Sequence, residues 1–269
     1  MRLRSLLYVP ADNERFIAKA HLRGADAIIL DLEDAVKPER RDMARDALPA
    51  SIRQAKAGGA QVFVRINADA ENLLPDARAA TAAGADALYV PKASRALLDG
   101  LDAALDGDIG FFALVEDPAA VLDAPAIAGH PRVRGLAVGG EDLATALGAT
   151  PDAETLRLPK LLVHYAAKAH DKLSLGLFGT VADFTDIAAI EALAAEARRH
   201  GFDGASCVHP SVVPVLNRVF APTPSELDWA ERVLALAETE RAGAFVLDGR
   251  MIDAPAIARA RALLAASGP

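Results

Sequence analysis

Charged residues follow a series of short apolar runs along this chain of 269 residues. They are of the types that carry acid–base, anion-binding or metal chemistry: Asp31, Glu33, Asp34, Arg65, Lys92, Glu116, Asp142 and His209. If the runs are parallel strands of one sheet, their carboxyl ends meet at one edge. We therefore expect an acidic cluster with a few cations at that edge.

Glu116 and Asp142 follow consecutive apolar runs, so their carboxylates are expected to converge on one hard cation. Oxygen ligands without a Cys or His pair favour Mg²⁺ over zinc, with water and substrate in the remaining positions. Helix capping is the alternative. It is weak for Glu116, because Asp117 and Pro118 already supply a cap and a first-turn proline, but it stays open for Asp142, which precedes LATALG.

Arg65 lies inside the apolar run VFVRIN, so its guanidinium is expected to be buried beside an anion. A structural Asp and a substrate carboxylate both meet that need, and we favour the substrate. Three roles fit the acidic run from Asp31 to Asp34: holding metal-bound water, holding Arg65, or capping the next helix.

Lys92 has three roles open to it: pairing with the acidic cluster, binding substrate, or forming a Schiff base. Pairing is favoured, because neighbouring carboxylates keep an ammonium group protonated. His209 is either a general base or, as we prefer, a hydrogen-bonded structural residue. Cys207 is the single cysteine, which excludes an intrachain disulfide, fits a reducing compartment and is predicted to lie in the core. No glycine fingerprint for a nucleotide cofactor is present.

The elements that position these residues are predicted from periodicity. Eight β-rich runs alternate with Ala-, Leu- and Arg-rich segments of helical period, which is typical of an α/β protein with a (β/α)₈ barrel. The strands are expected to end at Pro10, Glu33, Asn67, Lys92, Glu116, Asp142, Phe178 and Pro210. Gly24, Gly84 and Gly201 are expected to end helices in the left-handed conformation.

The barrel is expected to occupy residues 1–221, with residues 222–269 as a C-terminal helical extension. We predict that the extension contains a helix, a turn around FVLDGRMID and a last helix from about Pro255. Because the eight strand–helix units are already complete, this segment is free to cover its own active site or that of a neighbouring subunit.

The composition indicates a globular protein and argues against some classes of binding partner. A hydrophobic fraction of 52% supports a large core, and a net charge of −8 without a Lys/Arg run argues against nucleic acids and anionic membranes as partners. The apolar run before Pro10 is too short for a signal peptide or a membrane span, so we expect a cytoplasmic location.

With these residues in view, the sequence resembles the citrate lyase β-subunit-like branch of the HpcH/HpaI aldolase and citrate lyase family. The matching sequence motifs occur in the same order as in the family, from Arg4 to the last helix. The most specific of them are DLEDAV and GEDL. The full set is RSLLYVPADNERFIAKA, AIILDLEDAV, VFVRIN, ALYVPK, LVED, VGGEDLATALG, GFDGASCVHP and DGRMIDAPAIARA.

The resemblance implies a TIM barrel in a homotrimer or hexamer. It implies a carbon–carbon lyase acting on citryl, citramalyl or malyl thioesters of coenzyme A or acyl carrier protein. By position, Glu116 and Asp142 match the Mg²⁺ ligands and Arg65 the arginine that holds the substrate carboxylate. Asp253 in GRMID matches a catalytic aspartate that a neighbouring subunit presents. Asp31 and Lys92 complete the predicted substrate-binding set of Arg65 and Glu116.

Two departures from the family pattern lie where the thioester carrier is expected. Ala205 and Ser206 stand where relatives often carry a lysine, and LSLGLFGTVADFTD lacks the usual acidic residue near its start. Two other functions are therefore kept: a class II pyruvate or oxaloacetate aldolase without a thioester, and a non-catalytic subunit of a larger lyase complex. A non-catalytic subunit would not need a complete metal site, so the predicted metal ligands argue against that alternative.

Overall fold

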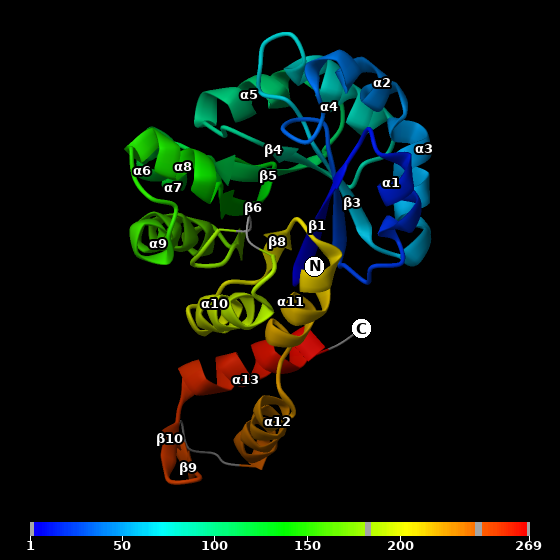
Figure 1. The fold of residues 1–269 in the computed structure, drawn as a ribbon. Helices are drawn as coiled ribbons and strands as arrows, with labels where there is room; N and C mark the ends of the chain where they lie inside the picture. The colour runs from blue at the N-terminus through cyan, green and yellow to red at the C-terminus, as the bar shows by residue number, and fades with distance from the viewer. Residues whose placement is uncertain (1–2, 181–183, 240–243, 268–269) are drawn as a thin grey trace.

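The computed structural model describes residues 3–180, 184–239 and 244–267. Eight parallel strands form one sheet in the order β7-β6-β5-β4-β3-β2-β1-β8. A bridge between Leu175 and Gly204 joins the two edge strands, so the sheet curls into a nearly closed barrel (Figure 1). This confirms the predicted (β/α)₈ class. The strands are β1 (Ser5–Pro10), β2 (Ala27–Asp31), β3 (Gln61–Arg65), β4 (Ala87–Val90), β5 (Gly110–Val115), β6 (Val133–Val138), β7 (Leu173–Leu175) and β8 (Ala205–Cys207).

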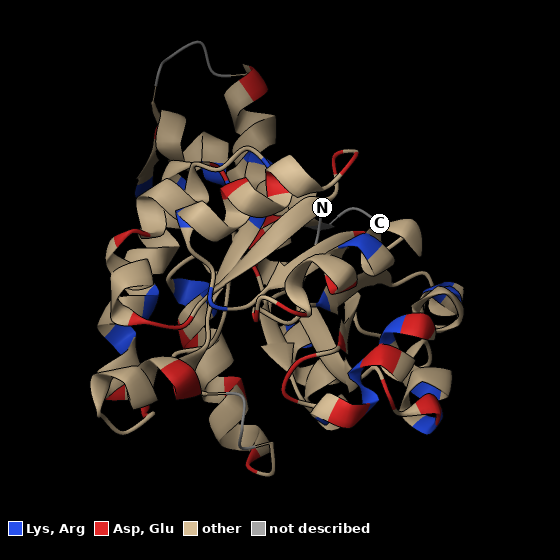
Figure 2. Ribbon diagram, turned by 90° about the horizontal axis from the view of Figure 1, so that it is seen from above, with Lys and Arg blue, Asp and Glu red and all other residues tan. Residues whose placement is uncertain are grey.

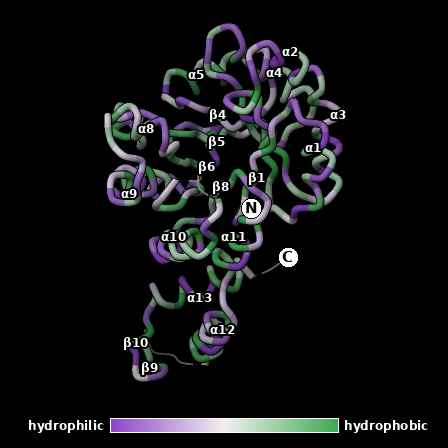
Figure 3. Tube along the Cα trace, viewed as in Figure 1, coloured by the Kyte–Doolittle hydropathy of each residue, from purple (hydrophilic) through white to green (hydrophobic). Residues whose placement is uncertain are grey.

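Helices surround the barrel and cover the outer faces of the strands (Figure 1). They are α1 (Glu14–Ala20), α2 (Arg41–Asp46), α3 (Leu48–Ala55), α4 (Leu73–Ala82), α5 (Arg95–Ala104), α6 (Pro118–Leu122), α7 (Ala124–Ala128), α8 (Gly140–Leu147), α9 (Ala153–Ala169), α10 (Ile187–Arg199) and α11 (Val213–Val219), with short 3₁₀ turns at Pro38–Arg40, Lys56–Gly58 and Pro210–Val212. The hydropathy-coloured trace shows apolar stretches along the strands and mixed character along the helices (Figure 3). This is the pattern of amphipathic helices packed on a buried sheet.

β1 ends at Pro10 as predicted, but the other strands of the barrel end earlier than the apolar runs predict. β6 ends at Val138 and β7 at Leu175, three to four residues before the expected ends. Gly139 and Gly140 take the chain out of β6 directly into α8. Asp142 therefore lies in the first turn of a helix, which corrects its predicted place at a strand end.

Two of the three predicted glycines, Gly84 and Gly201, directly follow the C-cap of a helix, whereas Gly24 lies three residues beyond His21, the C-cap of α1. Gly24, Gly84 and Gly201 have φ angles of 69°, 80° and 95°, which lie in the left-handed region that a residue without a Cβ adopts easily. Each stands shortly before the next strand, so these turns set where β2, β4 and β8 begin.

Side chains alternate between the barrel interior and the helical layer. On β4, Ala87 and Tyr89 belong to the inner cluster, whereas Leu88 and Val90 pack under the helices. The same alternation brings Arg65 of β3 to the inner face, two residues after Phe63. Polar residues near the carboxyl ends of the strands therefore face a common space.

The C-terminal extension contains α12 (Pro224–Thr239), a hairpin of β9 (Phe245–Leu247) and β10 (Arg250–Ile252), and α13 (Ala254–Ser267). It has a small hydrophobic cluster of its own: Ala230, Val233, Leu247, Ile252 and Ala260. Figure 1 shows it beyond α10 and α11, and an ion pair of 2.6 Å between Arg198 and Glu226 joins α10 to α12. The expected turn is a hairpin whose tip, Asp248-Gly249, has positive φ angles of 51° and 73°.

The surface carries both signs of charge. Lys and Arg are interspersed with Asp and Glu around the ring of helices (Figure 2). Within the described ranges, no helix has the length and apolar character needed to cross a membrane.

Candidate active site

A cavity of about 440 Å³ opens at the carboxyl ends of the strands. Its walls include five of the residues singled out from the sequence: Asp31, Asp34, Arg65, Glu116 and Asp142. Tyr8, Leu114, Ala137, Leu175 and Ser206 also line it, on the side of the barrel interior. The fold thus brings together, in one pocket, charged residues that are far apart in the sequence.

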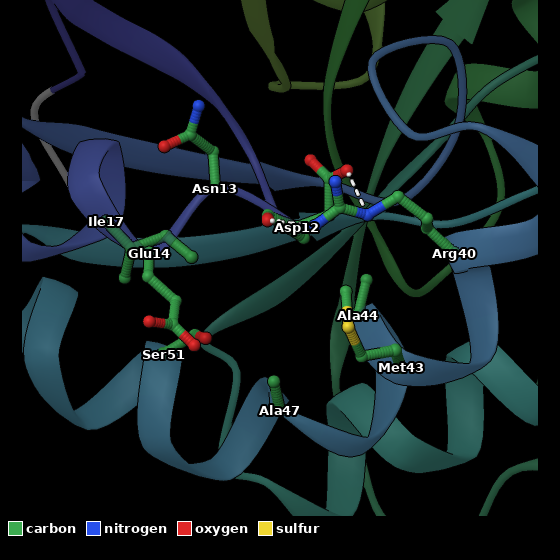
Figure 4. A pocket seen from close by; sticks show the side chains of 10 residues that line it. Asp12, Asn13, Glu14, Ile17, Arg40, Met43, Ala44, Ala47 and Ser51 are labelled. Atoms are coloured by element: carbon green, nitrogen blue, oxygen red, sulfur yellow. Dashed lines mark hydrogen bonds and ion pairs between the residues drawn. The ribbon is translucent and has the colours of Figure 1, made fainter.

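A second cavity of similar size lies between α1 and the α2–α3 segment (Figure 4). Its charged residues include Asp12, Glu14 and Arg40, and Arg40 Nε lies 3.1 Å from the Asp12 carboxylate. None of the residues predicted to act in chemistry lines it. We therefore place the active site in the pocket at the strand ends.

Arg65 is held by a bidentate pair with Asp31. Its Nε and Nη2 donate to the two carboxylate oxygens of Asp31, each over 2.7 Å. Burial lowers the pKa of Arg65, but the hydrogen bonds and charge of Asp31 raise it by more, so the guanidinium stays charged. Asp31 also accepts hydrogen bonds from the backbone of Glu33 and Ala35, which fixes the loop after β2. The sequence allowed two partners for Arg65, a structural Asp or a substrate carboxylate, and in this structure Asp31 is a structural partner.

Two more carboxylates surround the same guanidinium. Arg65 Nη1 lies 2.8 Å from Glu33 and 2.9 Å from Asp34. Burial raises the pKa of Glu33 to about 7, partly opposed by the charge of Arg65. Lys92 Nζ is 3.7 Å from the other Glu33 oxygen, and its side chain is mostly exposed. Lys92 is thus at the edge of the cluster, outside the lining of the pocket.

Glu116 points inward just beyond the end of β5. Its Oε2 accepts a hydrogen bond of 2.6 Å from the backbone N–H of Lys92, which has a positive φ of 47°. Burial raises the pKa of Glu116 to about 7; the Lys92 N–H opposes this, whereas Glu33 and Asp142 add to it. A carboxylate in this place is costly by itself and is stabilised by a cation.

Asp142 faces Glu116 from the first turn of α8. The N-cap of this helix is Gly139, and no side chain caps it, so the Asp142 carboxylate does not serve as the cap. Glu116 is buried whereas Asp142 is exposed to the pocket. Two carboxylates of this kind, with open space for water and substrate, fit the coordination of Mg²⁺.

Gly139 makes room for Glu116. A Cβ at position 139 would lie 2.6 Å from both Cγ and Oε1 of Glu116, closer than side-chain atoms approach. We expect Gly139→Ala to displace the Glu116 carboxylate and to weaken Mg²⁺ binding by about 10- to 100-fold, as loss of ligand orientation does elsewhere. Calorimetric titration of Mg²⁺ measures this. Gly100→Ala, at an open position in α5, is the matched control and should bind metal like the wild type.

Three other predicted residues lie elsewhere. Asp253 is the residue before α13, and its carboxylate accepts the Ala256 N–H at 3.3 Å, outside the pocket of its own chain. His209 bonds Ser211 and stacks on Phe184 with ring centroids 4.6 Å apart. Cys207 is buried, and burial raises the pKa of its thiol to about 12, as expected for a core residue.

Comparison with known proteins identifies the family. The model of the family described as HpcH/HpaI aldolase/citrate lyase matches residues 4–210. The chain belongs to this family. It is thus an enzyme of a lyase family, as the resemblance predicted.

Individual relatives cover nearly the whole chain. A (3S)-malyl-CoA thioesterase of Cereibacter sphaeroides is 37% identical over 268 residues, covering 97% of this chain and 93% of the relative. The citrate lyase subunit beta of Escherichia coli is 32% identical over 281 residues, covering 97% and 92%. The structure of protein CitE from Mycobacterium tuberculosis, in complex with magnesium, acetoacetate and coenzyme A, has a TM-score of 0.82 at 32% identity and covers 98% of both chains.

The pocket of this family member contains one cation that the sequence did not indicate. Lys160 of α9 is only 4% exposed and lines the cavity. Its Nζ donates to the carbonyl oxygen of Leu177 at 2.6 Å and to that of Gly179. It thereby ties the loop after β7 to the rim of the pocket. Its signal in the sequence is weak, because a lysine beside Pro159 in an amphipathic helix is usually a surface residue.

Lys160 should make stability depend on pH. Burial lowers its pKa to about 7 from 10.5, with Glu141 opposing, so the unfolded chain binds more protons than the folded one between these values. Its contribution to the free energy of unfolding therefore increases as pH rises from about 7 toward 10.5 and is lost below 7. Denaturant unfolding of wild type and Lys160→Met between pH 7 and 9.5 should show a steeper rise for the wild type, by at most about 1.4 kcal/mol per pH unit. Parallel curves would refute this.

Proposed function

We propose that this chain is a Mg²⁺-dependent carbon–carbon lyase that cleaves or forms a 3-hydroxy-acyl thioester of the malyl, citramalyl or citryl type. The observation that carries the proposal is the convergence of Glu116 and Asp142 on one pocket beside the Arg65–Asp31 pair. The carrier is coenzyme A or acyl carrier protein, in line with the coenzyme A complex of the Mycobacterium tuberculosis relative.

Glu116 and Asp142 would hold the Mg²⁺. In the described part of the chain no set of three or more His, Cys, Asp or Glu side chains is arranged around one metal position. Two protein ligands leave positions for water and for the oxygens of a keto acid, as is usual for Mg²⁺. When bound, the ion would supply a positive charge for the oxygen that is the hydroxyl of the thioester and the keto oxygen of the product, which is an alkoxide when the carbon–carbon bond breaks or forms.

Arg65 would bind the carboxylate of the keto-acid part. Asp31 takes one N–H of Nη2 and the N–H of Nε, which leaves a second N–H on Nη2. The side chain of Asp34 is 69% exposed, so water can solvate its carboxylate when it leaves Arg65. A substrate carboxylate would therefore replace Asp34 more easily than the buried Asp31 or Glu33. Asp31 then keeps the guanidinium in position. Glu116 lines the same pocket, whereas Glu33 and Lys92 lie outside its lining, behind Arg65 and at the edge of the cluster.

Asp253 would exchange a proton with the carbon of the thioester enolate. In its own chain this residue caps α13 and lies outside the pocket, so the carboxylate would come from the extension of a neighbouring subunit. A homotrimer or hexamer provides such a neighbour. The hairpin, whose Val246 and Met251 are exposed, and α13 would then cover the adjacent pocket and reduce the access of water.

Hydrolysis of a malyl thioester is a second candidate function. It is favoured by the 37% identity to the (3S)-malyl-CoA thioesterase. The two activities give different products, because a lyase releases a keto acid with a shorter thioester, whereas a hydrolase releases free malate and the thiol. A class II aldolase would release pyruvate from a 4-hydroxy-2-keto acid without any thioester.

Product analysis by mass spectrometry tests the proposal. Purified protein is incubated with Mg²⁺ and malyl-, citramalyl- or citryl-CoA, with EDTA as the control. We expect one of them to give a keto acid and a shorter acyl thioester in equal amounts, and only when metal is present. Release of the free thiol as the first product would establish the hydrolase instead, and activity only on free 4-hydroxy-2-keto acids would establish the aldolase.

A further inference from the structure

Three hydroxyl groups meet on the inner side of the pocket, and the reaction outlined above uses none of them. Tyr8 of β1 and Ser206 of β8 line the cavity, and Tyr89 of β4 lies directly behind it, with no exposed surface. The Tyr8 and Tyr89 rings meet edge to face with centroids 5.9 Å apart. Ser206 also belongs to the Ala205-Ser206 pair, which is one of the two departures from the family pattern described above.

The hydroxyl of Tyr89 has no hydrogen-bond partner in the described part of the chain, although it is fully buried. The groups that act on its pKa include Tyr8, Arg65, Glu116 and Ser206, all of which line the pocket. The hydroxyls of Tyr8 and Ser206 are close enough to act on the pKa of Tyr89 by hydrogen bonding, although neither contact has full hydrogen-bond geometry. A buried donor without a partner lowers stability, and such groups are found where function needs them.

The surroundings keep both phenols neutral. Burial raises the pKa of Tyr8 well above 10 and that of Tyr89 to about 12, so each keeps a proton to donate near neutral pH. The cations of the pocket are already engaged: Arg65 by carboxylates, and Lys160 by carbonyl groups. The guanidinium of Arg65 lies over the Tyr8 ring, 5.1 Å from its centroid, which places this ring beside the expected carboxylate site.

We propose that Tyr8 and Ser206 form a subsite that hydrogen-bonds an oxygen atom of the substrate, and that Tyr89 positions them by donating to one of their oxygens once the substrate is bound. The inference rests on the proposed function and adds the substrate class to it. The pocket selects a 2-keto acid whose carbon 3 carries a hydroxyl or a second carboxylate group over one whose carbon 3 carries a methyl group. A site built to bond such an oxygen discriminates strongly against analogues that lack it.

The test compares hydroxypyruvate with 2-oxobutyrate, which have the same number of heavy atoms and differ in one polar group. Their affinities for the full-length protein are measured by calorimetry in the presence of Mg²⁺. The wild type should bind hydroxypyruvate about tenfold or more tightly. Tyr8→Phe and Ser206→Ala should each lose most of this preference, with little change for 2-oxobutyrate. Tyr165→Phe changes the third tyrosine, which is 63% exposed on α9, and should behave like the wild type.

Tyr89→Phe separates positioning from a structural role. It removes a buried hydroxyl that has no partner, so the melting temperature should stay the same or increase while the preference for hydroxypyruvate decreases. A lower melting temperature with unchanged preference would show a structural role and overturn the assignment of Tyr89. Equal affinity of the wild type for the two acids, or unchanged preference in Tyr8→Phe and Ser206→Ala, would overturn the subsite while leaving the lyase proposal intact. Absence of any Mg²⁺-dependent binding of pyruvate, hydroxypyruvate and 2-oxobutyrate would overturn both.

Discussion

Glu116→Gln should reduce turnover by about a thousandfold or more and abolish the response to Mg²⁺. The amide keeps the shape of the side chain but removes the buried negative charge on which the proposed metal site depends. Charge stabilisation by a metal contributes several kcal/mol to a transition state, and each 1.36 kcal/mol corresponds to a factor of ten in rate. Steady-state release of the keto acid, measured over a Mg²⁺ titration, gives the comparison.

The same variant should remain folded. Burial raises the pKa of the Glu116 carboxyl to about 7, so its ionised form is destabilising without a cation, and the Gln variant should melt at or above the temperature of the metal-free wild type. Mg²⁺ should raise the melting temperature of the wild type alone. Glu154→Gln, at an exposed position in α9, serves as the control. Full metal-dependent turnover by Glu116→Gln would exclude this residue as a ligand.

Asp253→Ala should reduce turnover by about 10²- to 10⁴-fold, the usual contribution of a positioned acid or base, while leaving Mg²⁺ affinity unchanged. The affinity is expected to survive because the proposed ligands of the ion are Glu116 and Asp142, whereas Asp253 is assigned to the carbon of the thioester enolate. Calorimetric titration of Mg²⁺ alongside the kinetic assay separates the two effects. Loss of metal binding in this variant would contradict the role of Asp253 as a proton donor only.

Mixing two inactive variants tests whether Asp253 acts on a neighbouring subunit. Co-expression of Glu116→Gln with Asp253→Ala should restore a fraction of the wild-type turnover, because some sites then combine an intact metal pair with an intact Asp253 from the adjacent chain. Each variant expressed alone provides the baseline. If the co-expressed sample is no more active than the two baselines, Asp253 does not complete a neighbour's site.

The barrel and the group of residues at its carboxyl edge could be predicted from the sequence because both depend on local periodicity. A strand of period two that ends in a charge places that charge at the rim, and Asp31, Arg65 and Glu116 lie there as a result. Asp142 reaches the pocket for a different reason, since Gly139 and Gly140 start α8 early and turn its first residues inward.

Features that depend on tertiary packing could not be predicted in the same way. The partners of Arg65 come from β2 and the loop after it, and nothing within VFVRIN indicates that Asp31 accepts two hydrogen bonds from the guanidinium. Lys160 becomes a pocket residue only because the loop after β7 folds over it. Tyr8 and Tyr89 look like ordinary core residues in their strands, and their rings meet only when the barrel closes. The hairpin at Asp248-Gly249, by contrast, has a local signal, because an Asp-Gly pair between apolar residues is typical of a tight hairpin turn. From this signal we predicted the turn but not the two strands.

Anomalous X-ray scattering from crystals grown with Mn²⁺ and pyruvate is the most direct test of the metal site. Mn²⁺ shares the preference of Mg²⁺ for oxygen ligands and scatters anomalously. The account predicts one anomalous peak between the Glu116 and Asp142 carboxylates, with pyruvate bound to the ion and its carboxylate facing Arg65. A peak at another position, or a peak between other carboxylates of the pocket, would contradict the central claim.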